Sequence, residues 1–109
     1  MRYALLIYRD ENGEVSAEAE QLAGFAALAD KLGPRLVGSA RLRPTTMATT
    51  VRVRGGDVVI ADGPFAETKE QVGGFLLVDC TDLDEAIEVA SQIPTARWGT
   101  IEVRPVWEL

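Results

Sequence analysis

Two segments of the chain are apolar on both faces of a strand, which predicts that they lie in the centre of a sheet. In residues 3–8, YALLIY, the alternate positions 3, 5 and 7 and the positions 4, 6 and 8 between them are all apolar or aromatic. In residues 74–80, GFLLVDC, Phe75 and Leu77 share one face while Leu76 and Val78 share the other. We therefore expect both faces of this sheet to be covered.

Four further segments show patterns typical of strands. Residues 35–44 form one such segment, which Pro44 ends, and residues 48–54 and 57–62 flank Gly55-Gly56, a two-residue signal for a β-hairpin. On the first hairpin arm Val51 and Val53 share one face, and Thr50, Arg52 and Arg54 share the other. In residues 99–109, Ile101 and Val103 should point inward and Glu102 and Arg104 outward, until Pro105 ends the pairing or marks an edge.

Two segments have helical periodicity. The first begins at Ser16 as N-cap, ends at Gly33-Pro34 and has the predicted buried stripe Leu22, Phe25, Ala26, Ala29 and Leu32. The second begins at Asp82, with Glu85 at capping-box spacing, ends before Pro94 and has the predicted stripe Leu83, Ala86, Ile87 and Ala90. A short helical turn is also expected over residues 67–72, before Gly73-Gly74.

This order of elements predicts an α+β fold of the ferredoxin-like split βαβ type with an inserted β-hairpin, in a single domain over residues 1–109. Two helices cover only one face of an antiparallel sheet. The other face needs a second layer, and the same face of an identical chain supplies one. We therefore expect a homodimer that packs through its sheet faces.

Composition and charge narrow the partners. Lys and Arg number 11 against 17 Asp and Glu, a net charge of -6, which opposes binding to nucleic acid or to an anionic membrane. The N-terminal segment lacks the pattern of a signal peptide or membrane span, and the single Cys80 forms no internal disulfide and supplies no cysteine-rich zinc site. A cytoplasmic protein with small-molecule or protein partners is expected.

Histidine is absent from the chain, which restricts the chemistry further. Nucleophile activation of the Ser-His-Asp or Cys-His type is excluded. Acid or base groups must then be a carboxylate, Tyr, Lys, Cys80 or the substrate itself. No phosphate-binding loop, dinucleotide fingerprint or cluster of metal ligands is evident, so no metal or organic cofactor is expected.

Four stretches in this order and spacing resemble one known family: DGPFAETKE, GGFLLVD, LDEAIEVASQIP and IEVRPV. Together they are similar to the YCII-related family, in its DGPF-domain branch, over nearly the whole chain. The resemblance implies a dimeric α+β barrel. Some members lie beside or are fused to sigma factors, and a related member is a dehydrochlorinase of a chlorinated hydroxyhydroquinone. The family's proposed active site is a His-Asp pair, of which only the acid is matched here, by Asp62.

Asp62 is therefore the candidate catalytic acid or base. At the mouth of a sheet-lined cleft, partial desolvation would raise its pKa and make it a usable base. Alternatively, its carboxylate only accepts hydrogen bonds from backbone amides of its own turn, as Asp before Gly-Pro often does. Phe65 either walls the same cleft or anchors the loop in the core, and Glu67 or Lys69 either faces the cleft or lies on a solvated turn.

The candidate binding residues are Arg52, Arg104, Tyr8, Phe65 and Glu102. Arg52 and Arg104, with Arg43, could meet at an anionic ligand, because guanidinium groups pair with carboxylate or phosphate through two hydrogen bonds. The alternative is that such charges protect strand edges, and that Glu102 and Arg104 form a structural ion pair. Tyr8 is either a hydroxyl donor or a packing residue.

Two functions remain open from the sequence. The first is a small homodimeric protein that binds an anionic or phenolic compound near Asp62, in which case the resemblance implies a lyase or isomerase. The second is a non-enzymatic ligand-binding or regulatory module that is associated with a sigma factor through its outer helices. A domain that has lost its chemistry and serves assembly alone is a third alternative.

Overall fold

The computed structural model describes residues 1–13 and 18–108 and contains one four-stranded sheet, one separate hairpin and two α-helices. The strands are β1 (Arg2–Arg9), β2 (Leu36–Arg41), β3 (Thr49–Arg54), β4 (Asp57–Asp62), β5 (Gln71–Asp79) and β6 (Thr100–Pro105). The α-helices are α1 (Glu18–Leu32) and α2 (Leu83–Ser91), and three short 3₁₀ helices follow at Gly33–Arg35, Thr45–Met47 and Pro94–Arg97. The predicted N-cap Ser16 lies outside the described residues.

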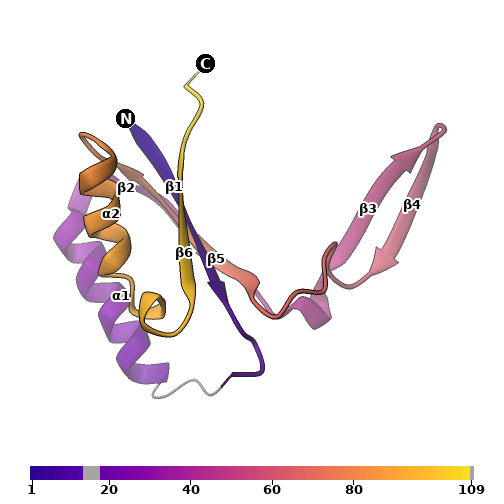
Figure 1. Cartoon of the computed structure of the whole chain (residues 1–109), viewed down its shortest axis with the longest axis horizontal. Helices are drawn as coiled ribbons and strands as arrows, with labels where there is room; N and C mark the ends of the chain where they lie inside the picture. The colour runs from indigo at the N-terminus through magenta and orange to yellow at the C-terminus, as the bar shows by residue number, and fades with distance from the viewer. Residues whose placement is uncertain (14–17, 109) are drawn as a thin grey trace.

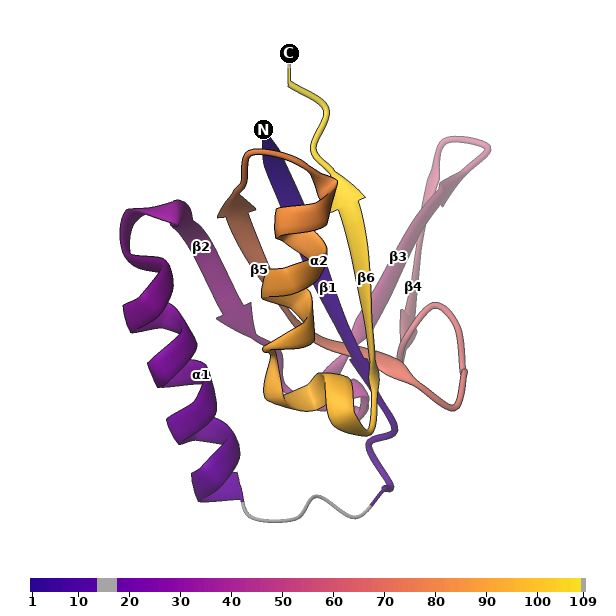
Figure 2. The ribbon, with the colours of Figure 1, turned by 60° about the vertical axis from the view of Figure 1, so that its left-hand side comes forward.

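The four-stranded sheet has the order β2-β5-β1-β6, with every neighbouring pair antiparallel. Both helices lie on one face of this sheet (Figure 2). This is the predicted ferredoxin-like split βαβ arrangement, and the α+β fold class is confirmed. Pro105 ends β6, which is an edge strand, as the sequence predicts.

The core lies between the sheet and the helices. On β1 the residues Tyr3, Leu5 and Ile7 are buried, and they pair with Val78, Leu76 and Gly74 of β5 on the same face. The opposite face, which carries Ala4, Leu6, Phe75 and Leu77, is only half-buried because no helix covers it. We call it the open face.

The hairpin of β3 and β4 forms a sheet of its own and projects away from the rest of the domain (Figure 1). Its turn at Gly55-Gly56 has φ angles of 56° and 83°, which favour glycine at both positions and match the twist of a two-residue hairpin. The predicted faces are confirmed, since Val51 and Val53 pair with Ile60 and Val58, and Arg52 pairs with Val59.

The helical stripes differ from those predicted. On α1 the buried residues are Leu28 and Leu32, with Phe25 partly buried, whereas Leu22 and Ala26 are exposed. In this orientation Gly24 lies against the ring of Pro94, where a Cβ atom would come within 2.7 Å of Cγ.

The second helix also differs from its predicted stripe. On α2 the buried residues are Ala86, Val89 and Ala90, while Leu83 and Ile87 are exposed. The N-cap is confirmed, because the Asp82 side chain accepts a hydrogen bond of 2.9 Å from the backbone N–H of Glu85.

The expected helical turn over residues 67–72 is wrong. The structure has bends there, and β5 already begins at Gln71 rather than at Gly74, so that Gly73 and Gly74 both lie inside the strand. Gly74 pairs with Ile7 and also with Arg41, so the backbone is fixed on both sides by strand pairing, and this outweighs the tendency of a glycine pair to break a strand.

Candidate functional site

A cavity of about 230 Å³ lies between α1 and the helix-covered face of the sheet. Its apolar lining consists of Ile7, Leu22, Phe25, Ala40, Phe75 and Leu76, together with Gly73 and Gly74. Its polar lining consists of Arg9, Gln21, Ser39, Arg41 and Thr95. Most of this wall is aliphatic or aromatic, so a ligand here would bury apolar atoms and meet few polar groups.

The glycine pair of β5 creates part of this space. Gly74 is buried, and a Cβ atom there would lie 2.7 Å from the carbonyl oxygen of Ala40, so no larger residue fits without displacing β2. At Gly73 the register between β1 and β5 shifts, and the Arg9 side chain lies beside this glycine. The sequence pattern predicts a strand that begins at Gly74, and it gives no sign that the glycine pair lines a cavity.

Two arginines lie at the same end of this cavity. Arg9 is the last residue of β1 and Arg41 is the last residue of β2, and these strands run parallel to each other on either side of β5. Strand order therefore places two arginines that are 32 positions apart in the sequence at one cavity. Guanidinium groups bind planar oxyanions through paired, charge-assisted hydrogen bonds. The cavity thus combines an apolar wall with cationic groups.

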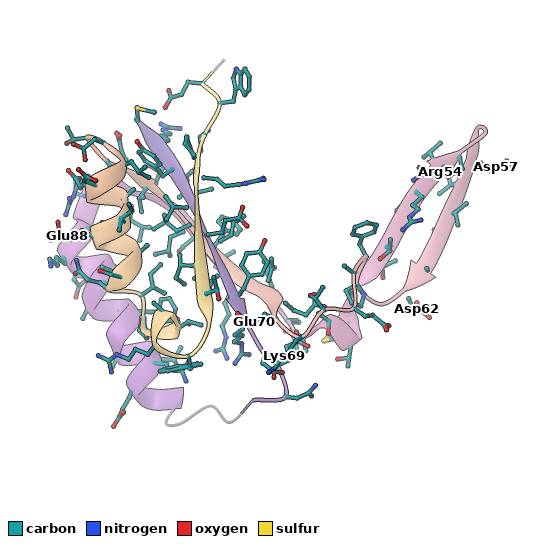
Figure 3. The ribbon with its side chains drawn as sticks, in the orientation of Figure 1. Arg54, Asp57, Asp62, Lys69, Glu70 and Glu88 are labelled. Carbon is teal, nitrogen blue, oxygen red and sulfur yellow. The ribbon has the colours of Figure 1, made fainter. Side chains whose placement is uncertain are left out.

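The predicted residues Asp62, Arg52 and Phe65 lie on or beside the hairpin and do not line this cavity. Asp62 is exposed at the base of the hairpin, away from the four-stranded sheet (Figure 3). The Arg52 guanidinium lies 5.2 Å from the centre of the Phe65 ring, a cation–π distance. Because Phe65 is 77% exposed, the prediction that it anchors its loop in the core is wrong for the single chain.

The hairpin register separates the predicted acid from the predicted anion-binding residue. Asp62 pairs with Thr49, and Arg52 pairs with Val59. Side chains alternate along a strand, so Asp62 lies on the face of Val51 and Val53, whereas Arg52 lies on the opposite face. Their joint role in one cleft therefore stays a prediction without support from this geometry.

The DGPF stretch is held as a turn by groups other than the Asp62 carboxylate. The Gly63 N–H donates to the Ala48 carbonyl oxygen at 2.8 Å, and the Thr50 hydroxyl donates to the Gly63 carbonyl oxygen at 2.7 Å. Within the described part of the chain, Asp62 has no hydrogen bond to its own turn. The alternative that its carboxylate caps this turn is wrong.

A second hollow, of about 350 Å³, lies beside the DGPF loop, and most of the residues that line it are polar or charged. Gly63, Pro64, Glu67 and Lys69 line it together with Glu11 and Thr45. The Glu11 carboxylate accepts hydrogen bonds from the backbone N–H of Thr45 at 2.9 Å and from its hydroxyl at 2.6 Å. Glu11 thus fixes the chain before the hairpin. The sequence did not predict this role, because Glu11 lies in a polar connecting segment with no further pattern.

Tyr8, Glu102 and Arg104 lie together on the open face. Tyr8 pairs with Thr100 across β1 and β6, next to the pair of Leu6 and Glu102. Arg104 Nε lies 2.8 Å from the Glu102 carboxylate, so the predicted ion pair between these two residues is present. These residues line neither hollow, and their role in substrate binding stays a prediction.

Two titratable groups have shifted pKa values, and both lie near the start of α2. Burial, reinforced by the negative charge of Glu85, raises the pKa of the Cys80 thiol. Hydrogen bonding from Thr81, followed by that from Arg35, lowers the pKa of Glu85, whose carboxylate lies 3.0 Å from Arg35 Nη1. Cys80 is thus a packed thiol rather than a reactive one.

Residues 1–13 and 18–108 contain neither a candidate metal site nor a candidate membrane-spanning helix. No group of three or more His, Cys, Asp or Glu side chains is arranged to hold a metal ion there. In the same residues, no helix has the length and apolar character needed to cross a membrane.

Comparison with known proteins identifies a family and similar chains. The family model of the YCII-related domain matches residues 1–109. The uncharacterised protein R00369 of Rhizobium meliloti (strain 1021) is 42% identical over 118 aligned positions, which cover 97% of this chain and 92% of that protein. The structure of 5-chloro-2-hydroxyhydroquinone dehydrochlorinase (TftG) from Burkholderia phenoliruptrix AC1100, in complex with 2,5-dihydroxybenzoquinone, superposes with a TM-score of 0.57. The two are 15% identical, with 99% of this chain and 94% of the other covered. At this identity the match shows a shared fold.

Proposed function

The chain belongs to the YCII-related family, and from this premise we propose that it binds a small, planar, anionic or phenolic compound in the cavity between α1 and the sheet. Arg9 and Arg41 hold the anionic oxygens, and Ile7, Leu22, Phe25 and Leu76 contact the ring. This places the ligand on the helix-covered face of the sheet rather than near Asp62.

The observation that carries the proposal is the meeting of two guanidinium groups with an apolar wall in one cavity. An engineered apolar cavity of about 150 Å³ in another protein binds benzene, so a cavity of about 230 Å³ suits a single substituted ring. A planar ring that carries an anionic oxygen matches both parts of this lining, the apolar wall and the cationic side chains.

The lining also limits the chemistry. Among the described residues around this cavity there is no carboxylate, Lys, Tyr or Cys, so proton transfer has to use the ligand's own hydroxyl group or water. Arginines next to a developing oxyanion stabilise it electrostatically. If the protein is a lyase or isomerase, this stabilisation of an enolate or phenolate is the contribution that its cavity makes.

The probe for this proposal is 2,5-dihydroxybenzoquinone, a planar ring with acidic hydroxyl groups, which is bound in the structurally similar dehydrochlorinase. Isothermal titration of the wild-type chain is compared with Arg9→Gln and Arg41→Gln. Each substitution should weaken binding at least about 10-fold, because it removes a charge-assisted hydrogen bond of roughly 1.5–3 kcal/mol. Arg54→Gln makes the same charge change on the hairpin, outside the cavity, and should leave affinity within about two-fold of wild type.

Failure of the wild-type chain to bind the probe would count against this ligand class. Equal binding by wild type, Arg9→Gln and Arg41→Gln would contradict the location. Equal losses in all three arginine variants would show that only overall charge matters.

A second candidate function is the regulatory module associated with a sigma factor. The observation that favours a protein partner on the outer helices is that Leu83 and Ile87 of α2 are about half exposed, at 50% and 51%. If this surface binds a sigma factor, the double substitution Leu83→Ser and Ile87→Ser should abolish binding to the purified sigma factor and leave probe binding unchanged. Equal binding by both forms would argue against this surface.

A further inference from the structure

Thr95 places a buried hydroxyl group at the wall of the cavity. It lies in the 3₁₀ turn Pro94–Arg97, which follows α2 and leads into β6 (Figure 2), and it lines the cavity between α1 and the sheet. Thr95 is only 3% exposed, whereas all other buried side chains of the described residues are aliphatic, aromatic or the Cys80 thiol. A hydroxyl group in such surroundings is unfavourable unless it has a hydrogen-bond partner.

The Thr95 hydroxyl has no partner within residues 1–13 and 18–108, since no hydrogen bond joins it to another of these residues. In the same ranges, every side-chain nitrogen or oxygen that is sealed from solvent does have a partner. The hydroxyl oxygen is therefore not sealed, and the space that it meets is the cavity. A ligand in the cavity can supply the missing partner.

The turn fixes the direction of this hydroxyl group. The Thr95 carbonyl oxygen accepts hydrogen bonds from the N–H of Gly99 at 2.7 Å and of Trp98 at 3.2 Å. The Thr95 methyl group lies against Gly99, where a Cβ atom would come within 3.0 Å of Cγ2. The backbone and the methyl group are thus held, and the hydroxyl on the same Cβ atom points away from Gly99. A group that is already fixed loses little conformational freedom when it binds a ligand.

The arginines reach the cavity from the other side. The turn that contains Thr95 leads into β6, which pairs with one edge of β1. The Arg9 side chain lies beside Gly73 of β5, which pairs with the other edge of β1, and Arg41 is one strand further away on β2. Two strands, β5 and β1, therefore separate Arg41 from Thr95, and neighbouring strands lie about 4.8 Å apart.

We infer that Thr95 determines which ring the cavity binds, because its hydroxyl group forms a hydrogen bond with a second ring oxygen, opposite the anionic oxygen that Arg9 and Arg41 hold. This inference rests on the function proposed for the cavity and narrows its ligands to rings with two oxygen substituents para to each other. Para substituents are the farthest apart on a six-membered ring, so they meet groups on opposite sides of the cavity. A threonine hydroxyl both donates and accepts, so a phenol hydroxyl or a quinone carbonyl satisfies it.

A pair of substitutions at Thr95 tests this role by isothermal titration with 2,5-dihydroxybenzoquinone, whose ring carries oxygens para to each other. Thr95→Val replaces the hydroxyl by a methyl group of similar shape and should weaken binding about 5–10-fold. Thr95→Ser keeps the hydroxyl and should stay within about three-fold of wild type. In urea titrations without ligand, Thr95→Val should be at least as stable as wild type, because it removes an unpartnered hydroxyl. A purely structural role of Thr95 would instead lower the stability of this variant.

Two benzoates that differ in a single hydroxyl group test the position of the second oxygen. Wild type should bind 4-hydroxybenzoate about 5–10-fold more tightly than benzoate, and Thr95→Val should bind the two equally. The isomer 3-hydroxybenzoate, in which the hydroxyl is meta, should gain no more than about two-fold over benzoate. Arg9→Gln should weaken the binding of benzoate and 4-hydroxybenzoate by the same factor, because both ligands carry the carboxylate.

The possible failures are distinguishable. Equal affinity of wild type and Thr95→Val for 2,5-dihydroxybenzoquinone, with Arg9→Gln and Arg41→Gln still weakened, would overturn the role of Thr95 and leave the function of the cavity standing. Equal affinity of wild type for benzoate and 4-hydroxybenzoate, or no binding of either, would overturn the para assignment. A wild-type chain that binds none of these probes would contradict the proposed function and this inference with it.

Discussion

The contact between α1 and the Pro94 ring gives a quantitative test of how this helix is positioned over the cavity. Gly24 lies in the middle of α1, and a Cβ atom at this position would come within 2.7 Å of Pro94 Cγ and 3.7 Å of Pro94 Cβ. The proline ring is stiff, so the helix or the Pro94–Arg97 turn has to move when Gly24 is replaced by Ala.

Two effects of opposite sign decide the outcome of Gly24→Ala. Alanine stabilises a helix interior by about 0.8 kcal/mol relative to glycine. Forcing a methyl group into a packed contact costs roughly 1–3 kcal/mol. We therefore expect a net destabilisation of about 1 kcal/mol, which lowers the melting temperature of a domain of this size by about 4–8 °C.

Urea denaturation followed by circular dichroism measures this change, at one fixed protein concentration because self-association also contributes to stability. Ala27→Gly is the matched control, since Ala27 is exposed on the same helix and reports the propensity difference alone. In a Pro94→Ala background the ring is absent, and Gly24→Ala should become stabilising. The reasoning is refuted if Gly24→Ala in the wild-type chain stabilises by as much as Ala27→Gly destabilises.

Three further predictions concern single side chains. Asp62→Asn should leave affinity for 2,5-dihydroxybenzoquinone unchanged in calorimetry, because Asp62 does not line the cavity, and a large loss would restore it as a site residue. Cys80, which is 3% exposed and has a raised pKa, should react with a thiol reagent at pH 8 only after denaturation, and rapid reaction of the native chain would contradict its burial. The pKa of Glu85 is lowered on folding, so its carboxylate stabilises the native state above the unfolded pKa, and this stabilisation is lost as the pH falls through the folded pKa. In urea titrations Glu85→Gln should therefore be less stable than wild type at pH 7 and equally stable near pH 2. A stability difference that persists at the acidic end would rule out the ionised form as its source.

The local elements were predictable where the sequence alone determines them. A glycine pair between alternating strands indicates a hairpin, and Asp82 three residues before Glu85 indicates an N-cap, and both are present. The buried faces of the two helices differ from the predicted ones, because an apolar pattern with helical period is compatible with several rotations of the helix about its axis. On α1 the observed rotation places Gly24 against Pro94, and this contact joins residues 70 positions apart.

The candidate site depends on the register of the hairpin and on the order of the strands in the sheet. The sequence encodes the first of these better than the second. A two-residue turn at Gly55-Gly56 fixes the hairpin register, so the separation of Asp62 from Arg52 onto opposite faces follows from counting outward from the turn. The placement of Arg9 and Arg41 at one cavity does not follow from any count, because it requires β5 to lie between β1 and β2. That strand order is set by tertiary packing. A pattern with period two therefore suffices to exclude a site on the hairpin that uses both residues, whereas the cavity arginines become neighbours only once the whole sheet is assembled.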